Sequence, residues 1–229
     1  MEHNPSSVNG STAGLAPSLA WFGKLPSAGD FVSRHMPYPM QQFWDRWCAD
    51  GMDALKAGSQ ASGLDVWGST PRWAFVLPAQ PGVPAGQMGV VAPSCDRVGR
   101  IFPFVVTVPV VPDQQHLLLS RAGLLGLAWA QVVAQAQEAR MSIEAVDSGL
   151  HNALAHTLAS EPLQDDDGET TLPRGMNPSS LPWPQLGMAF DLQGSESLWW
   201  SVPPASTGFQ SRAQLGPLKA MHFLNLCQR

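Results

Sequence analysis

The chain has 229 residues, of which 44% are hydrophobic, and this is enough to build the core of one large domain or two small ones. Its formal net charge is −5 and only 14% of its residues are charged, so it lacks the basic field that attracts nucleic acid or an acidic membrane. The cysteines Cys48, Cys95 and Cys227 are odd in number and far apart, which argues against a disulfide framework or a zinc knuckle and favours a reducing, cytoplasmic compartment.

Residues 1–18 are expected to form a flexible tail, because they lack the basic and apolar regions of a secretory signal. The most apolar stretch, residues 117–134, carries Arg121 and Gln131 and barely reaches the roughly 20 residues that a bilayer requires. We therefore expect a buried helix there and no membrane insertion.

The next two segments differ in their hydrophobic period. Residues 18–34 are predicted to form a short strand, a turn and a second extended segment, because Pro26 and Gly29 separate two apolar runs. In residues 37–58 the apolar side chains recur every three or four positions, which predicts an amphipathic helix that ends at Gly58. Its apolar face is formed by Phe43, Trp44, Trp47, Cys48, Met52 and Leu55.

Three short apolar runs, residues 72–78, 88–94 and 101–111, are predicted strands because they are rich in β-branched and aromatic residues. The last run is hydrophobic throughout, which is typical of a strand buried on both faces. Two helices are predicted to follow, over residues 116–140 and 142–160.

The remainder of the chain begins with an acidic, proline-rich surface loop, residues 161–184. Residues 186–192 and 196–202 are predicted to form a hairpin that turns at Gly194 and Ser195, and a short helix lies within residues 217–228. Helices that alternate with strands favour one α/β domain, residues 19–229, built as a three-layer α/β/α sandwich around a central mixed sheet.

The segment 93–104, PSCDRVGRIFPF, is a candidate reaction centre because it places Cys95 close to two arginines. A cysteine phosphatase requires the spacing C-x5-R, and Ile101 occupies the arginine position here. We favour a small residue in a turn that leads into a buried strand, since cysteine is among the most buried residue types. An enzyme that uses Cys95 remains an alternative.

Other catalytic and metal-binding patterns are incomplete. The run FGKLPSAGD resembles a Walker A motif only in part, because Ser18 and Leu25 occupy its first glycine and its Ser/Thr position. The chain has no G-x-S-x-G elbow, its six histidines are scattered, and the acidic run 165–167 lacks the alternation of a calcium loop. The sequence thus predicts no enzyme activity, no metal and no cofactor.

Charged residues in two Gly/Pro turns at strand ends form the candidate protein-binding site, because such loops often carry binding function. These residues are Lys24, Asp30, Asp96, Arg97 and Arg100. We hypothesise that Asp30 or Asp96 pairs with an arginine and joins the two turns, which leaves at least one charge to face a partner. The alternative is a pair that only braces the turns. The shape of the turns is assigned to Pro26, Gly29, Gly99 and Pro103.

Trp199 and Trp200 are a second candidate contact. Adjacent residues of a strand point to opposite faces of the sheet, so one tryptophan would face the core and the other would face outward. An exposed tryptophan is a good anchor for a partner protein. Packing of both side chains in the core is the slightly favoured alternative.

Five motifs in order along the chain carry a resemblance to a known family: WFGKLPSAGDFVSR, FWDRWCADGM, PRWAFVL, GVVAPSCDRVGRIFPF and SLWW. The chain resembles the TagF family of type VI secretion system-associated proteins, strongly over residues 20–110 and more loosely over 186–226. The resemblance implies a cytoplasmic α/β/α sandwich that represses type VI secretion post-translationally. It also implies that the protein binds the forkhead-associated (FHA) scaffold protein and opposes the assembly that threonine phosphorylation promotes.

Some members of this family are fused to a PP2C-like phosphatase domain, which this chain is too short to carry, so such a phosphatase is expected to be a separate protein. The chain departs from the family in having Cys95 at the variable position of the P-S-x-D-R-V-G-R-x-F-P block and in the acidic insertion at 161–184. A non-enzymatic repressor is the favoured function. An adaptor for type VI components or effectors, and an enzyme that uses Cys95, are the alternatives.

Overall fold

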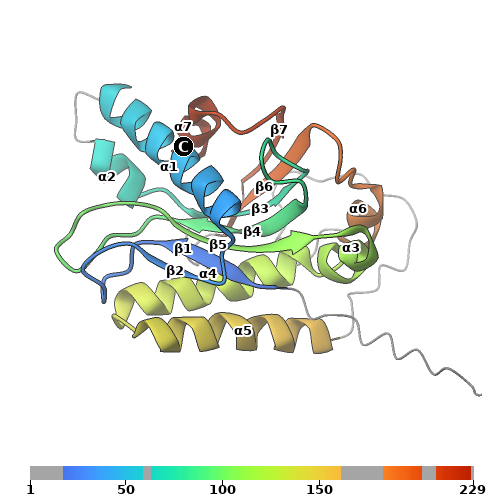
Figure 1. Cartoon of the computed structure of the whole chain (residues 1–229), viewed down its shortest axis with the longest axis horizontal. Coiled ribbons are helices and arrows are strands. Elements are labelled where there is room, and N and C mark those ends of the chain that lie inside the picture. Colours follow the sequence, from blue (N-terminus) through green and yellow to red (C-terminus); the bar gives the residue numbers. More distant parts are fainter. Residues whose placement is uncertain (1–17, 59–62, 161–182, 203–209, 228–229) are drawn as a thin grey trace, which may run out of the picture.

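The computed structural model describes residues 18–58, 63–160, 183–202 and 210–227, which include one seven-stranded sheet (Figure 1). The strands lie in the order β2-β1-β5-β4-β3-β6-β7. Their bounds are β1 (Ala20–Gly23), β2 (Val32–Arg34), β3 (Arg72–Leu77), β4 (Gly86–Ala92), β5 (Phe104–Val110), β6 (Glu196–Val202) and β7 (Ser211–Leu215). The helices of the same residues are α1 (Tyr38–Gly58), α2 (Gly63–Gly68), α3 (Pro112–Leu119), α4 (Ala122–Glu138), α5 (Ile143–Ala159), α6 (Trp183–Ala189) and α7 (Ala220–Cys227).

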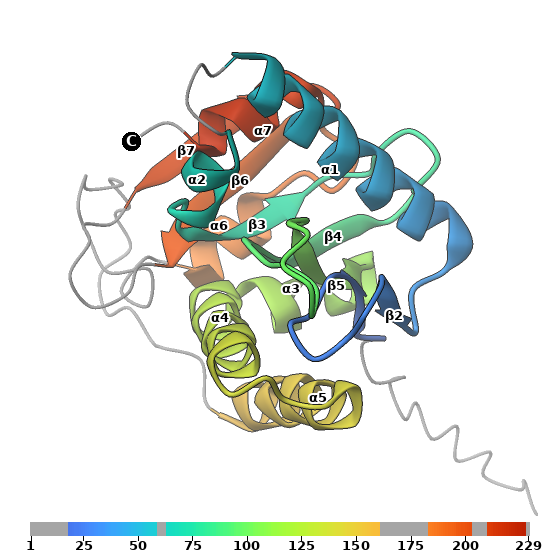
Figure 2. The same cartoon turned by 90° about the vertical axis from the view of Figure 1, so that its left-hand side faces the viewer.

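Helices lie on both faces of this sheet, with α1, α2 and α7 on one face and α4 and α5 on the other (Figures 1 and 2). Alternate residues of a strand point to opposite faces, and β3 shows the consequence. Ala74 and Val76 join the core on the side of α4, whereas Trp73, Phe75 and Leu77 join the core on the side of α1. Because both faces are covered, β4 is buried throughout and β5 almost throughout, as the hydrophobic run in β5 predicts.

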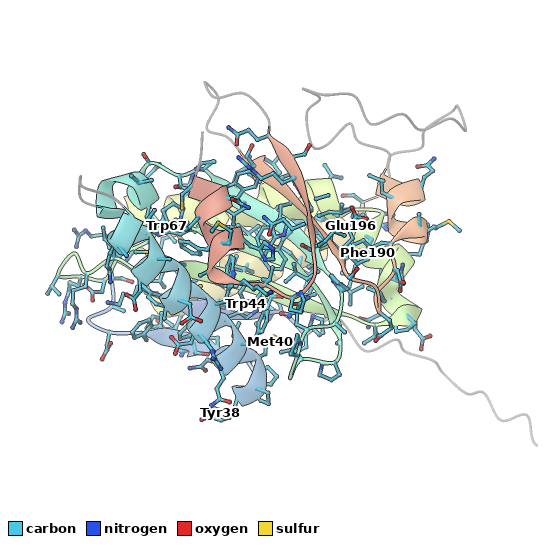
Figure 3. The ribbon with its side chains drawn as sticks, turned by 90° about the horizontal axis from the view of Figure 1, so that it is seen from above. Tyr38, Met40, Trp44, Trp67, Phe190 and Glu196 are labelled. Carbon is cyan, nitrogen blue, oxygen red and sulfur yellow. The ribbon has the colours of Figure 1, made fainter. Side chains whose placement is uncertain are left out.

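The predicted amphipathic helix is confirmed as α1, which packs on the sheet through a largely aromatic stripe. Its buried residues are Met40, Trp44, Trp47, Cys48, Gly51, Met52 and Leu55. The indole Nε1 of Trp44 donates a hydrogen bond of 2.9 Å to Oε1 of Gln87, so the side-chain oxygen of this buried β4 residue has a partner beneath the helix. Side chains of α1, together with the labelled Trp67 of α2, gather over this face of the sheet (Figure 3).

The α/β class is confirmed, but the prediction of a mixed sheet is wrong, because every pair of neighbouring strands is antiparallel. The connections explain this difference. Residues 78–85 join β3 to β4 and residues 93–103 join β4 to β5, and neither connection contains a helix that could cross over to a parallel neighbour. A parallel pair requires a crossover of about a dozen residues or more.

The single helix predicted over residues 116–140 is wrong, since this segment contains two helices. The axes of α3 and α4 are bent by 73° at Ser120 and Arg121. The Arg121 guanidinium stabilises the bend by donating to the carbonyl oxygens of Leu117 and Ser160. Apolar residues continue through the bend, so the periodicity does not reveal it.

No single helix of the described ranges is long and apolar enough to span a membrane. The bent pair of α3 and α4 has the required length and apolarity only when the two helices are taken together.

The predicted hairpin over residues 186–192 and 196–202 is also wrong in its first half. Residues 183–189 form α6, and β6 pairs instead with β3 and β7. The amide of Gln115 holds α6 against α3 by donating to the carbonyl oxygens of Gly187 and Phe190, at 2.8 and 2.7 Å. α2 and β7 have no counterpart among the predicted elements. The predicted tail at 1–18 and loop at 161–184 fall almost entirely outside the described residues.

Candidate functional site

The two charged Gly/Pro turns lie side by side because of the pairing between β1 and β5. These strands are antiparallel, with Gly23 opposite Phe104, so the end of β1 lies next to the start of β5. The turn that leaves β1, residues 24–31, therefore meets the turn that enters β5, residues 93–103 (Figures 1 and 2). We call these two segments the paired turns.

Asp96 is the centre of the paired turns. Its Oδ2 accepts hydrogen bonds from Nζ of Lys24, at 3.1 Å, and from Nε of Arg100, at 2.6 Å. Its Oδ1 accepts from the backbone N–H groups of Val98 and Arg100, at 3.1 and 2.9 Å. The carboxylate is fully buried and the side chain of Lys24 is only 8% exposed. The ion pair between the two turns is therefore largely shielded from water.

The pKa of Asp96 reflects these contacts. Burial alone would raise the pKa, because it disfavours the charged form. The hydrogen bonds from the Arg100 backbone, from the Lys24 and Arg100 side chains and from the Val98 backbone outweigh burial, and they hold the pKa of Asp96 well below its ordinary value. Asp96 is thus a carboxylate at any physiological pH.

Three further hydrogen bonds join the paired turns. The hydroxyl of Ser94 donates to the carbonyl oxygen of Lys24 at 2.6 Å. The backbone N–H of Arg97 donates to the carbonyl oxygen of Ala28 at 2.7 Å. Nη2 of Arg100 donates to the carbonyl oxygen of Gly29 at 2.7 Å. Of the hypothesised pairs, Asp96 does bond to an arginine, Arg100, but both residues lie in the same turn. The two turns are joined instead by the ion pair of Asp96 with Lys24 and by the bond from Arg100 to Gly29.

Two of the predicted turn residues, Gly99 and Pro103, lie where the backbone has a specific conformation or a close contact. Gly99 has a φ of +86°, a left-handed conformation that favours glycine, and its N–H donates to the carbonyl oxygen of Asp96. Pro103 lies where the chain enters β5, and its carbonyl oxygen would be 2.2 Å from a Cβ on Gly23. Glycine at position 23 thus permits the close approach of the two turns.

The outer surface of the paired turns combines charge with apolar side chains. Arg97 and Asp30 are exposed, and among the described residues neither forms an ion pair. The Asp30 carboxylate accepts only the backbone N–H of Phe31, at 2.8 Å. Next to these charges, Phe31 is 44% exposed and Val98 is 70% exposed. The structure thus leaves Arg97 and Asp30 available, while Lys24, Asp96 and Arg100 brace the turns.

Cys95 is half-buried and forms an isolated β-bridge with Ile101 at the base of its turn. Among the described residues, neither a histidine nor a carboxylate is hydrogen-bonded to its thiol. Cys95 thus occupies a turn position before β5, which agrees with the interpretation favoured from the sequence. Throughout residues 18–58, 63–160, 183–202 and 210–227, no cluster of three or more His, Cys, Asp or Glu residues could hold a metal ion.

Trp199 and Trp200 do not provide a contact surface. They point to opposite faces of β6, as expected for adjacent residues, but they are only 1% and 2% exposed. Helices cover both faces of the sheet, so both tryptophans pack in a core. The interpretation of one of them as an exposed anchor for a partner is therefore wrong.

The sequence did not single out Ser94, Phe31 or Val98. The hydroxyl of Ser94 bonds to the carbonyl oxygen of Lys24, which is 70 positions away, so no local pattern indicates this role. Phe31 stacks on Phe22 at 5.5 Å between ring centroids and lies beneath the ammonium of Lys24 at 5.0 Å. No local pattern reveals that Phe31 remains partly exposed, because its exposure depends on how the two turns meet.

Comparison with known proteins identifies the class to which this fold and site belong. The family model for the TagF N-terminal domain, described as type VI secretion system-associated, matches residues 20–156, which is more than half of the chain. The protein therefore belongs to the TagF family, as its motifs predict.

One solved structure resembles nearly the whole chain. It is the crystal structure of PA0076 from Pseudomonas aeruginosa PAO1, which is 26% identical to the chain and superimposes with a TM-score of 0.64. The similarity covers 92% of this chain and 94% of PA0076. No curated protein matches the sequence significantly.

Proposed function

We propose that this protein is a non-enzymatic, cytoplasmic, post-translational repressor of type VI secretion that binds the FHA scaffold protein through the paired turns. Membership of a family associated with the type VI system supports the general role. The observation that carries the binding surface is Arg97, an exposed cation without an ion pair among the described residues, beside the partly exposed Phe31 and Val98. Arginine and aromatic residues are enriched at the centres of protein interfaces.

The paired turns suit recognition because they are preorganised. Arg100 and Lys24 are both bonded to Asp96, and backbone hydrogen bonds join the two segments on either side of this group. A partner that docks on them pays little conformational entropy to order the surface. This division of roles predicts that the arginines at 97 and 100 respond differently to substitution.

We expect Arg97→Ala to leave stability unchanged and to weaken binding of the FHA scaffold protein by about 30-fold or more, the effect of losing an interface hot spot. Arg100→Ala should lower stability instead, because it removes the ion pair with Asp96 and the hydrogen bond to Gly29. Thermal unfolding and calorimetric titration of both variants would separate the two effects.

The matched control for Arg97→Ala is Arg46→Ala, which removes another exposed arginine from the distant helix α1. This control should bind like the wild type. Wild-type affinity of Arg97→Ala for the FHA protein, or unfolding of both turn variants without a selective loss of binding, would remove the recognition role from the paired turns.

Secretion assays test the rest of the proposal. A Cys95→Ser variant should repress secretion as the wild type does, since a repressor that acts by binding needs no nucleophile. Loss of repression in a folded Cys95→Ser protein would instead support the enzyme alternative. A separate PP2C-like phosphatase is the second partner that the family resemblance implies, and deleting it tests whether repression depends on dephosphorylation of the scaffold protein.

A further inference from the structure

A cavity of about 780 Å³ lies behind the paired turns, between the end of α2, the turn at 93–103 and the end of α4. These elements lie close together on the side of the molecule that faces the viewer in Figure 2. Pockets for small molecules typically measure about 300–1,000 Å³, so this space is large enough for one. We call it the turn cavity.

The charged side chains of the turn cavity are all cationic. Arg72 and Arg140 line it, and no acidic residue is among its described lining residues. Nη2 of Arg72 donates to Oε1 of Gln137 at 3.2 Å, and Nη1 of Arg140 donates to the carbonyl oxygen of Pro26 at 3.4 Å. Both guanidinium groups are thus held by neutral acceptors, and neither forms an ion pair within the described part of the chain. The acidic side chain that acts on Arg72 is Glu138, which does not line the turn cavity.

Two hydrogen-bond donors of lining residues are also unpaired. The Nε of Arg72 and the indole Nε1 of Trp67 are buried and have no hydrogen-bond partner among the described residues. Buried donors without a partner are uncommon in folded proteins and call for an explanation. A ligand that offers acceptor oxygens would also reduce the cost that burial imposes on Arg72, whose pKa is lowered by desolvation despite the opposing charge of Glu138.

The rest of the wall is mainly apolar. Pro71, Pro93 and Ile101 contribute to it, as does Trp67, the tryptophan labelled on α2 in Figure 3. A predominantly apolar pocket with a few convergent polar groups is the usual form of a site that binds a small molecule. Apolar walls favour a flat hydrocarbon part in the ligand, and the two arginines favour an anionic head.

We propose that the turn cavity binds a small molecule that combines a phosphate or carboxylate group with a flat apolar part. Arg72 and Arg140 contact the anionic group, and Trp67 and the proline walls contact the apolar part. The site is distinct from the outer surface of the paired turns, and it does not depend on the proposed role as a repressor.

Titration of the full chain with four probes tests this proposal. Phenyl phosphate and benzoate carry both features, inorganic phosphate lacks the apolar part, and benzyl alcohol lacks the charge. One of the first two should bind saturably at one site, more tightly than inorganic phosphate and benzyl alcohol, and their order shows whether the head group is a phosphate or a carboxylate. Absence of saturable binding by both, or equal affinity for inorganic phosphate, would overturn the proposal.

Two variants locate the binding. Arg140→Gln removes a charge from an exposed residue and should weaken binding by about 10-fold to 100-fold, the effect of losing a hydrogen bond to a charged group. Arg46→Gln, on α1 and outside the turn cavity, should have no effect. Unchanged affinity of Arg140→Gln would overturn the proposed site.

Amide and indole NMR spectra give a readout that does not depend on the variants. The indole N–H resonance of Trp67 should shift on binding, because Trp67 is a lining residue of the turn cavity and its buried N–H has no hydrogen-bond partner among the described residues. The indole of Trp129 already donates to the carbonyl oxygen of Leu150 and should not shift. Shifts confined to residues outside the turn cavity would contradict the assignment.

Discussion

At the scale of single residues, Asp96 determines the shape of the paired turns. Both of its oxygens accept two hydrogen bonds, one oxygen from Lys24 and Arg100 and the other from two backbone N–H groups of its own turn. The bonds to its own backbone resemble an Asx-turn, in which aspartate fixes the local chain. The bond to Lys24 connects that turn to the one after β1, so a single carboxylate orders both segments.

The substitution Asp96→Asn tests this interpretation. An asparagine keeps the size of the side chain but leaves the buried ammonium of Lys24 without a counter-charge. We expect a clearly lower melting temperature than for the wild type, measured by circular dichroism at neutral pH. Asp30→Asn is the matched control, because Asp30 is exposed and accepts only a neighbouring N–H, and it should melt like the wild type.

The lowered pKa of Asp96 predicts that its contribution to stability depends on pH. The pKa of Asp96 is lowered in the folded state, so the unfolded chain takes up a proton at a higher pH than the folded chain does. The stabilisation from Asp96 is therefore complete at neutral pH and declines as the pH falls below 3.8, its ordinary pKa. The difference in unfolding free energy between wild type and Asp96→Asn should shrink over that range, and a difference that is independent of pH would contradict the ion pair.

Some of these residue roles could be predicted from the sequence and others could not. The arginine that pairs with Asp96 lies four positions away, within reach of local reasoning. The pairing with Lys24 joins residues 72 positions apart and depends on the register of β1 with β5. The burial of Trp199 and Trp200 depends in the same way on helices from other parts of the chain, which local alternation does not indicate.

At the scale of elements, the crossing of α1 and α7 depends on Gly51. A Cβ at this position would lie 2.2 Å from Cγ of Phe223, a distance that requires the ring or one of the helices to move. Phe223 is fully buried between Trp47 and Trp67, with ring centroids at 5.3 and 4.6 Å, so it has little room to move.

We therefore expect Gly51→Ala to destabilise the protein. Overpacking a core usually costs about 1–3 kcal/mol, and alanine inside a helix gains about 1 kcal/mol over glycine, so the expected net loss is up to about 2 kcal/mol. Chemical denaturation would measure the difference. Gly58→Ala, at the end of the same helix and without a described atom within 4 Å of the added Cβ, is the control and should not destabilise. Equal stability of the two variants would contradict the tight crossing.

The elements that sequence reasoning identified are those whose signal is local. The period of α1 and the continuous hydrophobic run of β5 each appear within one segment, and the structure confirms both. The bend at Arg121 and the helix α6 depend on distant partners, Ser160 for the bend and Gln115 for the helix. Tertiary contacts of this kind override local propensity, so the sequence alone did not reveal them.

At the scale of the whole molecule, a sheet with helices on both faces places its distinctive chemistry at one end. The helices bury the tryptophans of the strands, whereas the paired turns lie where β1, β4 and β5 meet their connections (Figures 1 and 2). The turn cavity lies behind these turns. Two of the five family motifs, WFGKLPSAGDFVSR and GVVAPSCDRVGRIFPF, supply both strand residues of the core and the paired turns, whereas the other three lie outside the turns.

The measurement that most directly tests this account is capture of the FHA scaffold protein by the purified chain from a mixture of the cytoplasmic type VI components of the same cell. The scaffold protein would be supplied in phosphorylated and unphosphorylated forms. We predict specific capture of the scaffold protein, and we expect the Arg97→Ala variant to lose this capture. A preference for the phosphorylated or the unphosphorylated form would show whether binding depends on the phosphate group. Retention of a different component, with neither form of the scaffold protein captured, would contradict the account and favour an adaptor.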